Sequence, residues 1–138
     1  MDADANRATA LEFLRLMAAF EFDAMFDLMA DDATWRVVGD PQTFPPAGTL
    51  GKPERRAMFD GFVSVLRSLS FDIASTTAEG DRVAVEFTCR GESHAGPVYE
   101  NEFINLFRFR NGKIVSVYEL CGQQAVLAFG EALEEQQG

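Results

Sequence analysis

The chain has 138 residues, of which 22 are acidic and 12 are basic, so its formal net charge is −10. This length fits one domain with one hydrophobic core, and we expect a single domain over residues 1–138. The negative charge argues against electrostatic capture of nucleic acid or of an anionic membrane surface. One histidine and two cysteines are too few for a standard zinc or iron–sulfur site.

The sequence also lacks the common signals for secretion, membrane insertion and cofactor binding. Acidic residues interrupt the N-terminal segment, and no apolar run is long enough to span a membrane. Cys89 and Cys121 are expected to be buried free thiols, which is typical of a reducing compartment. We therefore expect a cytoplasmic protein. No phosphate-loop, dinucleotide-binding or zinc-protease motif occurs, so no metal or organic cofactor is expected.

Helical periodicity dominates the first half of the chain. A first apolar stripe at helical spacing consists of Ala10, Phe13, Leu14, Met17 and Ala18. A second consists of Phe22, Met25, Phe26 and Met29, and predicts a short helix that ends near residues 31–32. Residues 39–51 are rich in proline and glycine and predict an irregular loop. Pro53 and Glu54 then suit the first turn of a third helix. The buried face of that helix is predicted to carry Phe59, Phe62, Val63 and Leu66.

From residue 70 the apolar period changes to two, which is typical of strands that are buried on one face. The clearest alternation runs through Val83, Val85, Phe87 and Cys89. A second long strand passes through residues 103–109, and Asn111-Gly112 turns it into a strand over 114–121. The tail from Gln123 is predicted to be weakly helical. Helices followed by a meander of strands indicate an α+β fold, with helices on one face of a curved antiparallel sheet around a cone-shaped cavity.

Three segments carry a family resemblance: ADDATW at 30–35, FPPAGTLGKPE at 44–54 and YENEFINLFRFRNGKIVSVYE at 99–119. In order and spacing they resemble the nuclear-transport-factor-2-like superfamily, in particular its SnoaL-like and ketosteroid-isomerase-like branch. The resemblance implies a cystatin-like α+β barrel with N-terminal helices on the concave side of the sheet. It also implies a cavity for a small apolar organic ligand and pairing of two chains through the sheet.

The residues of a steroid isomerase are not retained. Where such an enzyme would carry a tyrosine and two aspartates, this chain has Phe13, Val37 and Asn105. Phenylalanine and valine cannot move protons, so steroid isomerisation is not expected. The related epoxide hydrolases and cyclases tend to carry an aspartate near the position of Gly122, which weakens that assignment. Since this fold supports many reactions, it does not define one.

The resemblance predicts that odd-numbered residues of the two long C-terminal strands face the cavity. These are Asn101, Phe103, Asn105, Phe107, Phe109, Val117, Glu119 and Cys121. A three-residue loop over 110–112 would place odd residues opposite odd residues. In that register Glu119 lies opposite Phe103, with Asn101 and Asn105 as diagonal neighbours.

Glu119 is the candidate acid or base. A carboxyl among phenylalanines loses hydration, which raises its pKa and suits it to proton transfer, with Asn101 and Asn105 as orienting groups. Glu119 would then catalyse an isomerase, cyclase, dehydratase or hydrolase type of reaction. The alternatives are that Glu119 is a satisfied structural acid, or that it turns outward.

Further candidates surround this acid. Trp35 and Val37 are predicted to form a cavity wall, Tyr99 a donor at the rim, and Asp40 a polar group at the mouth. A second hypothesis is a non-catalytic ligand-binding or interaction module. The even-numbered face, with Leu106, Arg108 and Tyr118, is the predicted homodimer surface.

Overall fold

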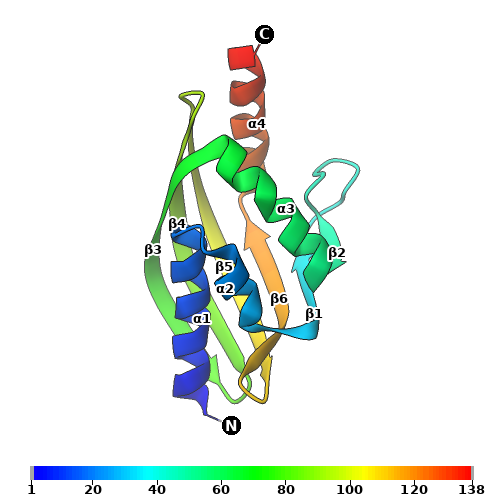
Figure 1. The fold of residues 1–138 in the computed structure, drawn as a ribbon, viewed down its shortest axis with the longest axis vertical. Helices are drawn as coiled ribbons and strands as arrows, with labels where there is room; N and C mark the ends of the chain where they lie inside the picture. Colours follow the sequence, from blue (N-terminus) through cyan, green and yellow to red (C-terminus); the bar gives the residue numbers. More distant parts are fainter. Residues whose placement is uncertain (1, 138) are drawn as a thin grey trace.

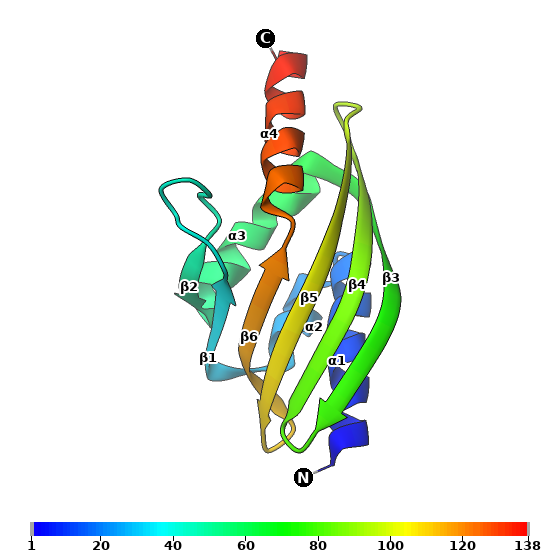
Figure 2. The ribbon, with the colours of Figure 1, turned by 180° about the vertical axis from the view of Figure 1, so that it is seen from behind.

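The computed structural model describes residues 2–137. Its elements, in chain order, are α1 (Ala3–Ala18), α2 (Phe22–Asp27), β1 (Met29–Val37), β2 (Gly48–Gly51), α3 (Lys52–Val65), β3 (Leu66–Glu79), β4 (Arg82–Ser93), β5 (Val98–Arg110), β6 (Lys113–Cys121) and α4 (Gln123–Gln137). Helices α1, α2 and α3 lie on one face of a curved sheet (Figure 1). The other face carries no helix (Figure 2), which gives the predicted α+β arrangement.

The six strands form one open sheet in the order β2-β1-β6-β5-β4-β3. All neighbours are antiparallel except β1 and β6, which run parallel. The predicted alternation in β4 is confirmed, because Val83, Val85, Phe87 and Cys89 are all buried. These side chains face the helices, so the hydrophobic core lies between the sheet and α1–α3.

The first helix follows its sequence pattern. The Asp2 carboxylate accepts hydrogen bonds from the backbone N–H groups of Asp4 and Ala5, at 3.0 and 3.2 Å, and so caps α1. Its predicted stripe is buried except for the half-buried Ala18 at the helix end, with Ala10 and Phe13 fully enclosed.

The second helix ends earlier than its stripe predicts. Helix α2 stops at Asp27, and Met29 already begins β1, with Asp31 and Asp32 inside that strand. The cause is strand pairing: Met29 pairs with Ile114, whose N–H donates to Leu28 O at 3.0 Å. Met29 is buried in the strand, and its spacing also fits the apolar stripe of a helix, so the stripe could not distinguish helix from strand.

The β5–β6 turn corrects the predicted loop. Arg110 pairs with Lys113, and Asn111 and Gly112 both have positive φ, at 51° and 79°. The connection is therefore a two-residue turn, not a three-residue loop. Odd residues nevertheless face odd residues, because a bulge lies between the Phe109–Ile114 and Arg108–Ser116 pairs. The prediction of the inward face was right, and its physical reason was wrong.

The predicted buried face of α3 is correct in part. Phe59 is buried, whereas Val63 is 50% exposed and Leu66 belongs to β3. Helix α4 contains no buried residue, and it rises from the end of the sheet beyond the other helices (Figures 1 and 2).

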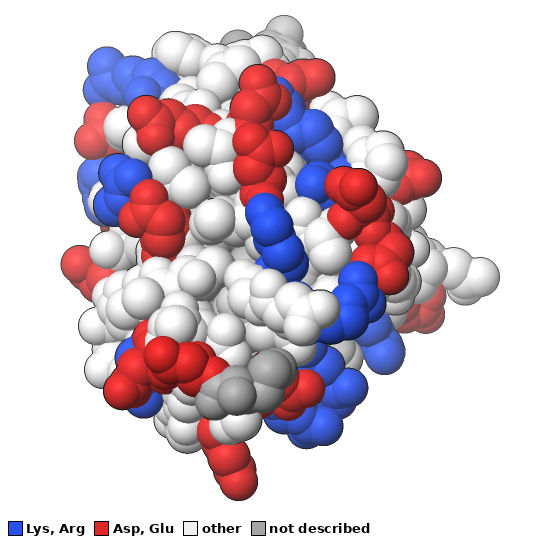
Figure 3. All heavy atoms as spheres, turned by 60° about the horizontal axis from the view of Figure 1, so that its bottom comes forward, with Lys and Arg blue, Asp and Glu red and all other residues white. Residues whose placement is uncertain are grey.

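Acidic and basic side chains are interspersed at the end of the molecule near the N-terminus (Figure 3). One of its ion pairs joins Arg110 and Asp32 at 2.7 Å. Among residues 2–137, no helix combines the length and the apolar character needed to cross a bilayer. Within the same residues, histidine, cysteine and carboxylate side chains form no group suited to holding a metal ion.

Candidate functional site

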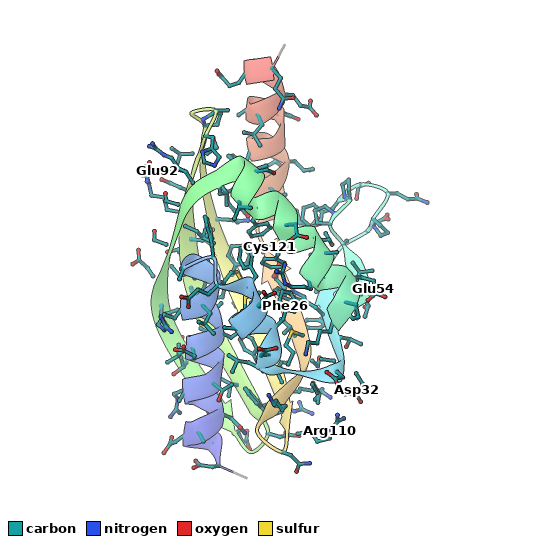
Figure 4. The ribbon with its side chains drawn as sticks, viewed as in Figure 1. Phe26, Asp32, Glu54, Glu92, Arg110 and Cys121 are labelled. Atoms are coloured by element: carbon teal, nitrogen blue, oxygen red, sulfur yellow. The ribbon has the colours of Figure 1, made fainter. Side chains whose placement is uncertain are left out.

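A cavity of about 350 Å³ lies between the concave face of the sheet and the helices. Its walls are strongly aromatic. The sheet contributes Trp35, Phe71, Phe87 and Phe103. The helices and the 38–47 loop contribute Phe44, Phe59, Phe62 and Phe129. The labelled Cys121 also borders this space, and in Figure 4 it lies within the body of the fold, whereas Glu92 and Arg110 lie at its periphery.

Within the described part of the chain, Glu119 is the one carboxylate that lines this cavity. It lies near the end of β6, and its Oε1 accepts a hydrogen bond from Trp35 Nε1 at 3.3 Å. Burial among apolar side chains raises the pKa of Glu119 to about 7, against the opposing effects of the Trp35 hydrogen bond and the Arg55 charge. The group can therefore exchange a proton near neutral pH.

The pairing of β5 with β6 is shifted by two residues from the predicted register, in which Glu119 lay opposite Phe103. Glu119 lies opposite Asn105, and Phe103 lies opposite Cys121. The two-residue turn and the bulge together set this register, which the turn sequence alone does not specify. The correction brings the Asn105 amide into the position directly across from the carboxyl.

The two predicted orienting amides have different roles. Asn105 lines the cavity, and its Oδ1 is enclosed without a hydrogen-bond donor in the described chain. Asn101 does not line the cavity, and its amide is fully engaged by protein. Its Nδ2 donates to Tyr99 Oη at 2.7 Å and to Gly122 O at 3.0 Å. Its Oδ1 accepts from the N–H groups of Glu102 and Gly122, at 2.8 and 3.1 Å. Asn101 therefore stabilises the junction between β6 and α4, and does not present an amide to a ligand.

Tyr99 is held in the cavity wall. Its hydroxyl accepts from Asn101, and its ring packs against Phe129 of α4 with centroids 5.1 Å apart. Burial raises the pKa of Tyr99 above its usual value, so the phenol keeps its proton. With Asn101 occupying one lone pair, the O–H group remains as a hydrogen-bond donor.

The other predicted site residues divide into wall residues and residues behind the wall. Val37 lines the cavity with Trp35, as do Phe103 and Cys121. Phe13, Phe107 and Val117 are fully buried but lie behind the lining, where the Phe13 ring contacts both Trp35 and Phe107.

Asp40 lies outside the cavity lining and is exposed. Its carboxylate accepts the backbone N–H of Gln42 at 2.9 Å, so it forms a local turn.

The two cysteines border the cavity as free thiols, as expected. Burial raises the pKa of Cys89 to about 12 and that of Cys121 to about 11. Thiols that keep their protons at neutral pH are poor nucleophiles. Their contribution is to the shape and polarity of the wall.

Sequence reasoning missed Arg55, which is 4% exposed beneath the cavity wall. Its guanidinium donates to the backbone carbonyls of Trp35 and Gly48. The signal was present in the sequence, because residues 55, 59, 62 and 66 share one helical stripe and Arg55 begins it. The adjacent Arg56 masks this signal, because two consecutive arginines are typical of an exposed helix surface.

The fold is that of nuclear-transport-factor-2-like proteins, since it is shared with a protein of that description from Burkholderia pseudomallei. Residues 10–117 match the SnoaL-like domain, so the chain belongs to the SnoaL-like family. No curated protein matches the chain in sequence.

Several solved structures share the fold. PrhC from Penicillium brasilianum is 15% identical, with a TM-score of 0.86 over 98% of this chain and 91% of that one. The BvnE pinacolase from Penicillium brevicompactum is 17% identical, with a TM-score of 0.83 over 98% of each chain. An LEH-like epoxide hydrolase from M. tuberculosis is 15% identical, with a TM-score of 0.75 over 95% of this chain and 96% of that one. At these identities the similarity establishes the fold and not the reaction.

Proposed function

We propose that this protein binds a small hydrophobic organic molecule in its cavity and catalyses cofactor-free proton transfer, with Glu119 as the acid or base. The reaction would be of the isomerase, cyclase, dehydratase or hydrolase type. The supporting observation is the Glu119 carboxyl itself. It lies in an apolar cavity, is held by the Trp35 indole N–H, and has a pKa raised to about 7.

Three polar residues of the cavity and its aromatic walls have separate roles in this proposal. Glu119 would take a proton from a carbon or oxygen atom of the ligand and return it at another position. The Tyr99 hydroxyl would donate a hydrogen bond to a ligand oxygen, and the Asn105 amide would lie beside the reacting group. The aromatic walls would exclude water, which strengthens these polar interactions.

Hydrogen–deuterium exchange tests the proton transfer without knowledge of the natural substrate. The neutral bicyclic ketone 2-tetralone, incubated with the protein in deuterium oxide, should gain deuterium at the carbon next to its carbonyl faster than in buffer. Glu119 would remove the proton, exchange it with solvent and return deuterium. Mass spectrometry measures the incorporation.

The matched variants are Glu119→Gln and Glu79→Gln, since Glu79 is exposed at the end of β3. Glutamine keeps an oxygen that can accept from Trp35 but cannot take a proton. Glu119→Gln should reduce the accelerated exchange by at least about a hundredfold, and Glu79→Gln should leave it unchanged. Equal exchange in wild type and Glu119→Gln would refute the catalytic role.

A non-catalytic binding module is the second candidate. It is favoured by Phe13, Val37 and Asn105, because none of these side chains titrates in the range where proton transfer occurs. Trp35 is the single tryptophan of the chain and lines the cavity, so its fluorescence reports occupancy. A change in this fluorescence with 2-tetralone, together with no exchange above buffer, would support this candidate over the enzyme.

We also propose a homodimer through the helix-free face of the sheet. Ile104 and Leu120 are 49% and 42% exposed there, beside the predicted Leu106, Arg108 and Tyr118. A shallow groove of about 330 Å³ on this face is bordered by Glu86 and Glu102 as well as by Ile104 and Leu120. A twofold axis would let Arg108 of one protomer approach these carboxylates on the other.

Light scattering at micromolar concentration tests this assembly. The mass should be about twice 15.3 kDa, and Ile104→Asp should halve it by placing charge in the apolar centre of the interface. A wild-type monomer would contradict the proposal. A cytoplasmic location is proposed on the free state of Cys89 and Cys121.

A further inference from the structure

Arg55 of α3 is a buried cation that forms no salt bridge with any residue of the described range 2–137. It is 4% exposed, and none of the ion pairs within residues 2–137 includes it. Its Nε and Nη2 both donate to Trp35 O, at 3.3 and 3.2 Å. Nη2 also donates to Gly48 O at 3.0 Å, and Nη1 reaches the Met58 sulfur at 3.5 Å. Each nitrogen of the guanidinium therefore has at least one hydrogen-bond partner, but no salt bridge neutralises its charge.

Such an arrangement is costly for the fold alone. Burial disfavours the charged form of any group, and here it lowers the pKa of Arg55, although the charge of Glu119 opposes that shift. The helical stripe that contains Arg55 continues with Phe59 and Phe62, so an apolar residue at position 55 would fit the same stripe. Strands β1 and β2 already pair through their backbones at Trp35–Leu50 and Val37–Gly48. The packing of the fold alone therefore does not account for a buried cation at position 55.

Trp35 connects this cation to the cavity. The backbone carbonyl of Trp35 accepts from Arg55, and the indole Nε1 of the same residue donates to Glu119 Oε1 at 3.3 Å. One residue therefore links the buried cation to the carboxyl that lines the cavity. We propose that Arg55 is a positioning residue for Glu119, fixing the Trp35 indole against its carboxyl and supplying the positive charge that keeps the ionised carboxylate accessible.

Among residues 2–137, no other side chain that borders the cavity supplies a positive charge. The remaining titratable side chains that border the cavity are Cys89 of β4, Tyr99 of β5 and Cys121 of β6. Burial raises the pKa of each of these three, so they are neutral at pH 7. The α1 and α4 helices contribute Met17, Val126 and Phe129, which do not titrate. Burial raises the pKa of Glu119, and Arg55 opposes that rise.

The consequence is a carboxyl that exchanges its proton near neutral pH instead of remaining a neutral acid. Loss of the Arg55 charge should raise the pKa of Glu119 by on the order of one pH unit. At pH 6 the ionised fraction of Glu119 would then fall about tenfold. This inference rests on the proposed function for its catalytic meaning, but the titration of Glu119 is measured in the ligand-free protein and does not depend on any reaction.

Carbon-13 NMR of glutamate-labelled protein tests the proposal, with Glu119→Gln identifying the resonance. Arg55→Gln removes the charge and keeps an amide donor for the carbonyls, and Arg55→Met removes both. Arg56→Met is the matched control, because Arg56 is the adjacent arginine and pairs with Asp23 and Asp60. Both Arg55 variants should raise the pKa of Glu119, and Arg56→Met should leave it at the wild-type value.

The indole N–H resonance of the single tryptophan gives a second readout. In wild type it should shift as Glu119 titrates, because Trp35 donates to that carboxyl. In Arg55→Lys the charge remains but the forked contact with the Trp35 carbonyl is lost, so the indole shift should change more than the pKa does.

A pKa of Glu119 that is unchanged or lowered in Arg55→Gln or Arg55→Met would overturn the proposal. If neither neutral variant folds, Arg55→Lys decides, and an unchanged indole resonance in that variant would also overturn it. Failure of the proposed function has a different signature, namely equal deuterium exchange in wild type and Glu119→Gln.

Discussion

Replacing Glu119 by glutamine should stabilise the protein increasingly as the pH rises. The pKa of Glu119 is raised from 4.5 to about 7, so the folded chain holds this proton more tightly than the unfolded chain. The free energy of unfolding therefore falls as the pH rises from about 4.5 to about 7, and it stays lowered above that range. A displacement of this size corresponds to about 3 kcal/mol, which is an upper limit because the carboxyl faces a cavity that water can enter. Glutamine remains neutral at every pH and avoids this loss.

Urea denaturation at pH 4 and pH 8, followed by Trp35 fluorescence and circular dichroism, measures the effect. The stability difference between Glu119→Gln and wild type should grow by up to about 3 kcal/mol between the two pH values. All other titrating groups are common to both proteins and cancel in the difference. Glu79→Gln, at an exposed position, should show no such growth. A Glu119→Gln difference that is the same at both pH values would refute the reasoning from burial.

Two other substitutions test the surroundings of the acid. Asn105→Leu should raise the free energy of unfolding by about 1 kcal/mol, because it removes an enclosed Oδ1 that has no hydrogen-bond donor. The same substitution should weaken the binding of 2-tetralone, which Trp35 fluorescence measures. Lower stability would show that this amide has a partner. Gly122→Ala should cost about 1–3 kcal/mol in urea denaturation, since its Cβ would meet Asn101 Oδ1 at 2.5 Å. Gly130→Ala is the control, because nothing lies within 4 Å of its added Cβ, and it should stabilise α4 by up to about 1 kcal/mol. Equal effects of the two glycine substitutions would contradict this account.

Local patterns predicted the elements whose identity depends on one periodicity. The alternation in β4 predicted a strand with one buried face, and the stripe of α1 predicted a buried helix, because burial of one face requires that spacing. Patterns that were compatible with two structures failed. Met29 satisfied both a helix and a strand, and pairing with β6 decided between them.

The composition of the cavity could be predicted in part. The family resemblance, combined with the alternation along β5 and β6, placed Asn105, Glu119 and Cys121 on the inward face, and these residues line the cavity. The same alternation included Asn101, Phe107 and Val117, which face inward but lie behind the lining. The distinction depends on the curvature of the sheet and on how deeply the helices pack, and neither quantity has a local sequence signature.

The sequence by itself determined the helices α1 and α3, the long C-terminal strands and the SnoaL-like resemblance, whereas strand β2 lies inside the segment that was predicted to be an irregular loop. These depend on side-chain type and spacing, which are local properties. Only the tertiary structure decided that Glu119 faces Asn105, that Asn101 holds Tyr99 and Gly122, and that Arg55 lies behind Trp35. Each of these contacts joins segments that are distant in the chain or depends on a bulge. A bulge shifts the pairing of two strands without changing the alternation from which their faces are read.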